Sequence, residues 1–320
     1  MNIRRATAIA ASATLALGLA ACGGDSGNGG DAGDRPNQMY TWVSNQSDRE
    51  QWETFIAGVQ ETEPEFNLTL DGPSFQEYWT LVKTRMSASD APCIITTQAA
   101  RAQELGSLLA PLDELAADAG LDLGQYNEAM MQGLTVDGSV RAIPYDAEPM
   151  LLFFNKAMFE EGGLTPPGAG YSREQFLSDA KALTKDGKMG FGISADISYP
   201  FLPLSFANGI TPSQDGELTL TDPALVEDFQ WTMDLVAKEQ VATAPNPGDT
   251  DEVGRQGFMA GNIAMHIDGP WFYSTYQEGS DSEVGIASPP SDDGSPNGMI
   301  QGSGFGVADS RTRPPPSRTS

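Results

Sequence analysis

The sequence predicts an α/β fold, because short apolar segments typical of strands alternate with segments of helical periodicity through the first third of the chain. The order strand, helix, strand, helix, strand predicts a parallel sheet with right-handed crossovers. In such sheets, ligands meet the carboxyl ends of the strands. The length of 320 residues is enough for two domains that share a deep cleft.

In the first part of the chain, three strands are predicted at 39–43, 66–70 and 92–96. Helices are predicted after the capping boxes that begin at Ser47 and Ser74, in which Ser and Glu satisfy each other's free backbone amides. The second helix should bury one face, formed by Tyr78, Leu81, Val82 and Met86. Shorter helices are expected around 100–105 and 112–117.

Further strands are predicted in the rest of the chain at 140–144, 150–154, 191–194, 263–267 and 284–287. Ser172 begins a third capping box, and Asp222–Pro223 places a good N-cap before a proline at the first helical position. Helices are also expected from 249 to 261 and from 271 to 276.

The charge and the scarce imidazoles and thiols exclude several functions. The formal net charge of -26 repels nucleic acid and anionic lipid, and it is read as a solubility device. The one histidine, His266, excludes a metal site built from several imidazoles, and we expect no metal and no cofactor. If Cys22 is modified, Cys93 has no partner for an intramolecular disulfide.

The N-terminus has the three parts of an export signal, residues 1–21. Arg4 and Arg5 form a positive start, and the apolar stretch 6–21 is too short for an ordinary transmembrane helix. The sequence Leu-Ala-Ala-Cys, which ends at Cys22, resembles the lipobox of bacterial lipoproteins, in which a diacylglycerol is added to the cysteine. A plain secretory peptide is the alternative. Residues 22–38 are then the lipidated cysteine and a flexible tether.

Four segments together resemble the extracellular solute-binding proteins of carbohydrate ABC transporters, the group that includes the maltose-binding proteins. In chain order they are the turn 142–146, the strand and helix 151–164, the segment 257–271 with its Gly-Pro-Trp, and the strand 302–307. Phe153, Phe154 and Asn262 depart from the usual residues. Each segment alone is weak evidence, but four in order behind a lipobox are strong evidence.

This resemblance implies two α/β lobes joined by crossing strands, with a periplasmic-binding-protein-like fold. Residues 39–147 and 301–309 would form the first lobe, and residues 148–300 would form the second. It also implies open and closed states that interconvert at a hinge, with a ligand that stabilises the closed state by touching both lobes. A membrane permease would read the closed shape, and the chain would work as a monomer on the outer side of the cell membrane.

The expected ligand residues are aromatic rings that stack on sugar faces and polar groups that bind hydroxyls, all near predicted strand ends. They are Trp42, Asn45, Gln98, Tyr145, Asp146, Glu148, Tyr199, Asn208, Asp268 and Trp271. Trp271 matches the stacking tryptophan of the family.

Several of these residues have a simpler reading. Trp42 could be a core residue, and Asp146 could cap a turn. We expect Trp52, Trp79 and Trp231 to pack on helical faces and His266 to be a satisfied core residue. Residues 292–294 resemble a calcium loop in composition only, so a solvated turn is expected there.

Two other function classes remain open at this point. The chain could bind a different solute, such as a polyamine, whose cations would suit an acidic cleft. A secreted glycosidase would need a carboxylate pair, for which Asp146 with Glu148, or Asp268 with an acidic partner, can be proposed. With 44 acidic residues such pairs arise by chance, and the sequence contains no Gly-x-Ser-x-Gly, HExxH or phosphate-loop motif.

The last stretch, residues 310–320, differs in composition from the rest of the chain. Its final ten residues contain three arginines, three prolines and no apolar side chain. A disordered tail is one explanation. The resemblance implies a longer first lobe, so we expect an aberrant tail from a frameshifted or truncated gene, which could prevent folding.

Overall fold

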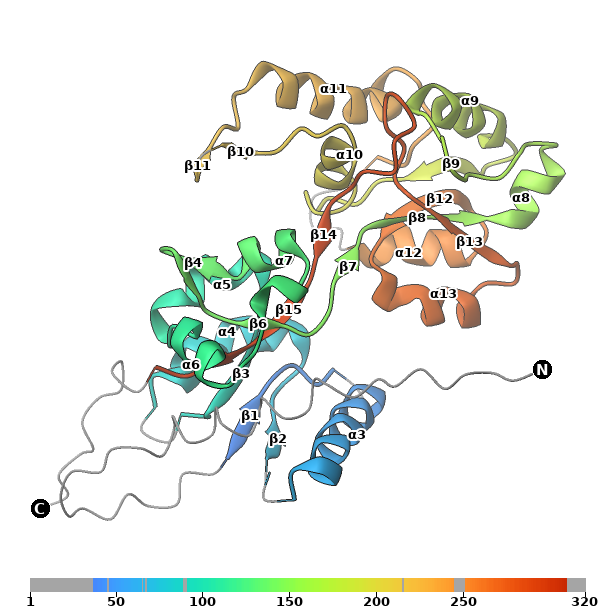
Figure 1. Cartoon of the computed structure of the whole chain (residues 1–320). Helices are drawn as coiled ribbons and strands as arrows, with labels where there is room; N and C mark the ends of the chain where they lie inside the picture. Colours follow the sequence, from blue (N-terminus) through green and yellow to red (C-terminus); the bar gives the residue numbers. More distant parts are fainter. Residues whose placement is uncertain are drawn as a thin grey trace, which may run out of the picture. The chain divides into compact units, whose positions relative to one another are not determined.

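A computed structural model describes residues 37–44, 46–64, 66, 68–88, 91–214, 216–244 and 251–309. The chain divides into two compact units: Met1–Ala147 with Gln301–Ser320, and Glu148–Ile300 (Figure 1). The signal segment, Cys22, Asn45 and the tail 310–320 lie outside the described residues. No helix in the described part is both long enough and apolar enough to cross a bilayer.

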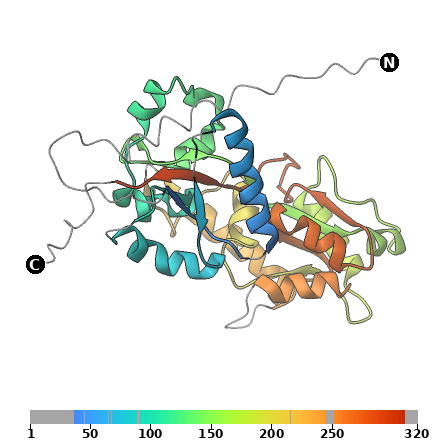
Figure 2. The same cartoon turned by 90° about the horizontal axis from the view of Figure 1, so that it is seen from below.

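The first unit is built on a five-stranded sheet with the order β2-β1-β3-β15-β6. Strands β1 (Gln38–Tyr40), β2 (Thr69–Asp71) and β3 (Ile94–Gln98) are parallel, as the strand–helix alternation predicts. Strand β15 (Ser303–Val307) runs antiparallel to β3 and to β6 (Ile143–Pro144). Figure 2 shows this late strand, in red, among elements from the N-terminal half.

Helices connect and cover these strands. They are α3 (Gln46–Thr62), α4 (Phe75–Met86), η1 (Ala99–Arg101), α5 (Ala102–Leu105), η2 (Gly106–Leu108), α6 (Asp113–Asp118), η3 (Leu123–Gln125) and α7 (Glu128–Gly133). A small hairpin of β4 (Thr135–Val136) and β5 (Ser139–Val140) follows. On α4, Tyr78, Val82 and Met86 are buried at a spacing of four residues, whereas Leu81 is 45% exposed, so its expected burial is wrong.

The two predicted capping boxes of this unit form differently from the expected pattern. Helix α3 begins at Gln46, before Ser47, and Asp48 accepts the backbone N–H of Ser44. Ser74 is the N-cap of α4, but its hydroxyl donates to the side chain of Glu77. The Ser-x-x-Glu pattern therefore locates these helix starts without fixing the hydrogen bonds.

The second unit contains a four-stranded sheet with the order β13-β8-β12-β9. Strand β8 (Leu151–Asn155) is antiparallel to β13 (Val284–Ala287) and β12 (Ile263–Asp268), and only β9 (Met189–Gly192) is parallel to β12. The sheet of this unit is therefore mixed. Strands β7 (Glu148–Pro149) and β14 (Ile300–Gln301) pair separately.

The helices of this unit are α8 (Lys156–Glu161), α9 (Arg173–Leu183), α10 (Phe201–Ala207), α11 (Pro223–Ala237), α12 (Asp251–Met259), η4 (Pro270–Phe272) and α13 (Tyr273–Gly279). A short hairpin of β10 (Ser213–Gln214) and β11 (Glu217–Leu218) precedes α11. The predicted N-caps are confirmed here. Ser172, just before α9, accepts from the Gln175 amide, and Asp222, just before α11, accepts from the Ala224 amide.

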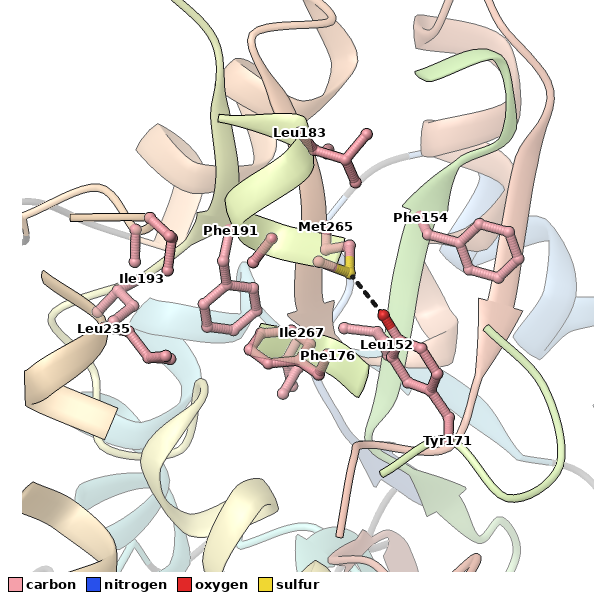
Figure 3. Close-up of a cluster of buried hydrophobic side chains, with 14 of the residues drawn as sticks. Leu152, Phe154, Tyr171, Phe176, Leu183, Phe191, Ile193, Leu235, Met265 and Ile267 are labelled. Atoms are coloured by element: carbon pink, nitrogen blue, oxygen red, sulfur yellow. Dashed lines mark hydrogen bonds between the residues drawn. The ribbon is translucent and has the colours of Figure 1, made fainter. Parts of the chain in front are cut away.

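The core of the second unit lies between its sheet and α9 and α11 (Figure 3). Phe176 from α9 packs edge-on against Phe191 of β9, with ring centroids 5.1 Å apart. Tyr171 donates its hydroxyl to Asp179 and lies 3.6 Å from the sulfur of Met265. Trp231 packs against this core, as its helical position predicts.

Candidate functional site

In the first unit, one edge of the sheet collects four of the predicted ligand residues. Because β1 and β3 are parallel, Trp42, just after β1, and Gln98, the last residue of β3, lie at the same end of the sheet. Gln98 pairs in register with Ser303, and the Tyr145 amide donates to the Ser303 carbonyl. Asp146 accepts the Ser303 amide. The return strand thus brings Gln98, Tyr145 and Asp146 together from distant parts of the sequence.

Trp42 belongs to an aromatic cluster and is half-buried. Its ring lies 5.4 Å from the rings of Phe75 and Tyr78 and 5.6 Å from that of Trp79. Phe75 is 39% exposed at the start of α4, so the cluster reaches the surface. These contacts support the reading of Trp42 as a packing residue, and its contact with a ligand stays a prediction.

Tyr145 has a second aromatic environment. Its ring is 4.7 Å from Phe305 of β15 and 5.3 Å from Trp52 of α3, and all three are partly buried. Aromatic pairs at these separations contribute beyond the area they bury. Much of this ring is therefore used in packing within the first unit.

Asp146 occupies a partly buried position beside the return strand. Burial raises the pKa of its carboxyl, and the hydrogen bond from the Ser303 amide opposes that rise. Ser303 is far from Asp146 in the sequence, so this hydrogen bond is a tertiary contact and differs from the local bond by which an Asp caps a turn.

In the second unit, Asp268 is a network residue at the end of β12. Its side chain is fully buried and accepts hydrogen bonds from Arg255 Nε at 3.1 Å and from the Tyr276 hydroxyl at 2.6 Å. It also accepts from the Gly269 amide at 2.8 Å. The Asp268 carboxylate thereby joins α12, β12 and α13, which gives it a structural role, and its contact with a ligand stays a prediction.

Trp271 lies close in the sequence to the residues of this network. The Phe272 ring covers the Arg255 guanidinium at 3.3 Å, and the Trp271 indole lies so close to Gly269 that a Cβ there would be 2.1 Å from the ring. Trp271 nonetheless stays 38% exposed. The indole therefore packs closely over Gly269 and stays partly exposed, which suits a ring that stacks on a ligand.

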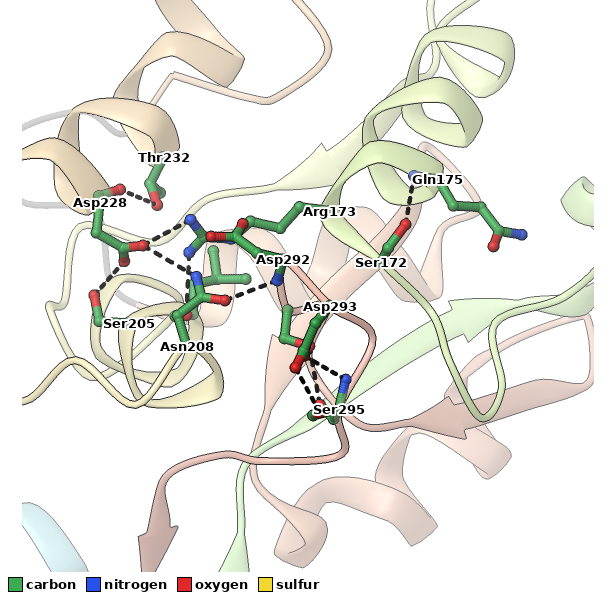
Figure 4. A network of polar contacts seen from close by, with 12 residues as sticks. Ser172, Arg173, Gln175, Ser205, Asn208, Asp228, Thr232, Asp292, Asp293 and Ser295 are labelled. Carbon is green, nitrogen blue, oxygen red and sulfur yellow. Dashed lines mark hydrogen bonds and ion pairs between the residues drawn. The ribbon is translucent and has the colours of Figure 1, made fainter.

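Asn208 belongs to a different network, shown in Figure 4. Its amide donates to Asp228 at 3.2 Å, and its carbonyl accepts from the Asp292 amide at 2.8 Å. Asp228 also pairs with Arg173 at 2.6 Å, and this arginine lies over Trp231. Asn208 therefore links α10, α11 and the 291–295 loop, and both ends of its amide are engaged inside the unit.

The remaining predicted residues of the second unit have less distinctive positions. Tyr199 precedes a cis Pro200 and packs against the main core, half-buried. Glu148 lies in β7 and is partly exposed. His266 is 1% exposed, which confirms its expected core position, and its Nδ1 is 3.2 Å from the Gly192 carbonyl oxygen.

The expected turn at 292–294 is confirmed, since Asp293 accepts hydrogen bonds from the amide and hydroxyl of Ser295. Across the described ranges, no group of three or more His, Cys, Asp or Glu side chains could hold a metal ion. Cys93 is buried and is not a free cysteine, which differs from the expectation that it has no disulfide partner.

Sequence reasoning missed Arg255 and Phe75. Arg255 is 6% exposed on α12. In the sequence it could have been noticed as the single cation of a helix that leads into a buried strand. Phe75 directly follows an N-cap serine and is 39% exposed, and its ring packs edge-on against Trp42 and Trp79.

Comparison with known proteins identifies the class that this two-unit α/β fold defines. The family model for bacterial extracellular solute-binding proteins matches residues 58–317. The chain belongs to this family, which confirms the resemblance drawn from the four segments.

Among curated relatives, the maltodextrin-binding protein MdxE of Bacillus subtilis is 22% identical over 294 residues, which are 86% of this chain and 65% of MdxE. The diacetylchitobiose binding protein DasA of Streptomyces coelicolor is 22% identical over 266 residues, 78% of this chain and 61% of DasA. The chain thus spans just under two thirds of the length of these relatives.

Solved structures show the same fold. The substrate-binding protein Lmo0181 of Listeria monocytogenes, in complex with cycloalternan, matches with a TM-score of 0.70 at 19% identity, over 86% of this chain and 71% of that one. The GacH receptor of Streptomyces glaucescens, solved with acarbose, matches with a TM-score of 0.70 at 22% identity, over 87% and 72%. UgpB of Mycobacterium tuberculosis, in complex with glycerophosphocholine, reaches a TM-score of 0.73 at 22% identity, over 87% and 71%.

Proposed function

We propose that this chain is the substrate-binding lipoprotein of an ABC importer and that it captures a neutral carbohydrate for the membrane permease. The observation that carries the proposal is the partly exposed indole of Trp271, packed over Gly269, in a chain of the solute-binding family. Flat rings with apolar faces suit the C–H faces of sugars, and the names of MdxE and DasA refer to oligosaccharides.

The polar groups of the first unit support the same reading. Gln98 and Asp146 lie at the edge of the sheet where parallel strands end, and Trp42 adds a partly accessible ring there. Amides and carboxylates at such an edge are suited to binding hydroxyl groups. In this proposal the chain binds and releases the ligand, and no covalent bond is made or broken.

A thermal-shift array tests this function. The protein should be stabilised by a neutral oligosaccharide such as a maltodextrin or diacetylchitobiose, by about 2.7 kcal/mol at a ligand concentration one hundred times Kd. Spermidine and glycerophosphocholine are the comparison arms, the latter because UgpB was solved with it. Stabilisation by spermidine or glycerophosphocholine alone would reject the carbohydrate assignment.

We further propose that Cys22 carries a diacylglycerol and holds the mature chain to the outer side of the cell membrane. The lipobox-like sequence before Cys22 supports this. A thiol in a thioether to lipid cannot also form a disulfide, so mass spectrometry of the exported protein decides between the two. A lipid-modified N-terminal peptide is expected, and an unmodified Cys22 or a bond from it to Cys93 would refute the anchor.

A further inference from the structure

Helix α11 carries two apolar stripes, and only one of them is covered. Leu225 and Leu235 are buried, together with Asp228 and Thr232, on the face toward the unit's interior. Val226, Phe229 and Met233 follow at spacings of three and four residues on an adjacent face, where Val226 is 53% and Met233 39% exposed. A surface helix ordinarily has one apolar stripe.

The second stripe lines a hollow of about 300 Å³ with residues from neighbouring elements. Phe201 of α10 contributes a ring whose centroid is 5.3 Å from that of Phe229, and Leu220 closes the side toward the hairpin. Leu220 is 55% exposed and Leu218 of β11 is 74% exposed. Of the thirteen exposed large apolar side chains in the described ranges, four fall within residues 218–233, so they form one patch.

The charges around this patch have one sign. Residues 201–237 contain six Asp and Glu residues and no Lys or Arg. Glu217, Asp222 and Glu227 are exposed beside the apolar side chains. A second copy of this chain, with a net charge of -26, and an anionic membrane surface would both be repelled. The charge pattern therefore selects a partner that combines apolar side chains with Lys or Arg.

We propose that this hollow, formed between α10, α11 and Leu220, docks a basic amphipathic segment of the importer's membrane subunits. The inference rests on the proposed function, since it names the surface through which the second unit meets that partner. Apolar side chains of the segment fill the hollow, and its cations face Glu217, Asp222 and Glu227.

The test uses the importer's membrane subunits in lipid nanodiscs and measures ATP hydrolysis stimulated by the sugar-loaded protein. The double variant Val226→Ser with Met233→Ser removes two exposed apolar side chains without touching the core stripe. We expect the concentration for half-maximal stimulation to rise at least about tenfold, while the Kd for sugar and the Tm stay unchanged. The control variant is Val253→Ser with Ile286→Ser, which are 55% and 48% exposed elsewhere in the same unit, and it should behave as wild type.

A charge-reversal variant tests the exposed acidic residues beside the hollow. Glu217→Lys with Glu227→Lys should weaken stimulation and reduce its dependence on salt. A photo-crosslinker at position 226 should capture a Lys- or Arg-rich segment of a membrane subunit. Unchanged stimulation by the Val226→Ser, Met233→Ser variant, with sugar binding intact, would overturn this inference alone. A wild-type protein that binds no sugar would overturn the proposed function instead.

Discussion

At the scale of single residues, the turn after β12 separates two roles that look alike in the sequence. Asp268 and Trp271 are three positions apart, and both were predicted to touch the ligand. The structure buries Asp268 against Arg255 and Tyr276, and leaves Trp271 half-exposed. The sequence could not show this, because the side chains that donate to the Asp268 carboxylate come from the helix before β12 and from the helix after it.

Replacing Trp271 with Ala tests the predicted stacking ring. Loss of an aromatic contact with the sugar should weaken binding by about 1–3 kcal/mol, measured by calorimetry, with little change in Tm. Tyr273→Ala is the matched control, because Tyr273 is a 42% exposed ring two positions away on α13. Equal affinities for Trp271→Ala and wild type would remove Trp271 from the site.

Asp146→Asn tests the carboxyl beside the return strand. Burial raises the pKa of Asp146 in the folded chain, so its deprotonation costs stability as the pH rises through that value. The Asn oxygen can still accept the Ser303 amide. The variant should therefore melt above wild type at neutral pH and converge with it below the usual Asp range. A difference that persists or grows in acid would contradict this account.

At the scale of elements, local signals located most helices and strands. The caps at Ser172 and Asp222 formed as expected, and β13 spans the predicted residues. Strand pairing is not encoded by periodicity alone. The sheet of the second unit is mixed because β8 runs antiparallel to both of its neighbours. Leu81 stayed exposed because nothing packs over that side of α4 in the described residues.

Gly190→Ala probes the packing of β9 against α9. A Cβ at this position would lie 2.3 Å from the Ala180 carbonyl oxygen and 2.6 Å from its Cα, both backbone atoms that cannot rotate away. We expect a loss of about 1–3 kcal/mol in the free energy of unfolding, measured with urea. Gly58→Ala is the control: it lies on the exposed side of α3 with no atom near its Cβ, and should gain about 0.5–1 kcal/mol.

Asp268→Asn probes the network that ties α12, β12 and α13 together. Removing the carboxylate leaves the buried Arg255 guanidinium without its charge partner, which should cost about 3–5 kcal/mol of stability. Arg255→Met with Asp268→Leu removes both charges, and this double variant should recover much of the loss. A double variant less stable than Asp268→Asn would show that the pair stabilises beyond its own desolvation cost.

At the scale of the whole chain, four short segments in the right order were enough to indicate the family, which the match over residues 58–317 confirms. The ligand residues were harder to predict. The sheet edge of the first unit brings together Gln98, Tyr145 and Asp146 through a strand that returns from residue 303, so their proximity depends on the fold. Asn208 was predicted to bind the ligand because of its residue type. Only the structure shows that its side-chain amide is already hydrogen-bonded within the second unit.

Calorimetric titration of the purified protein with the oligosaccharide that gives the largest thermal shift tests the central claim most directly, with chromatography of the sugar recovered afterwards. The account predicts saturable binding of one sugar per chain, weakened by Trp271→Ala, and a recovered sugar of unchanged length. Absence of binding up to millimolar sugar, or release of shorter products, would contradict it.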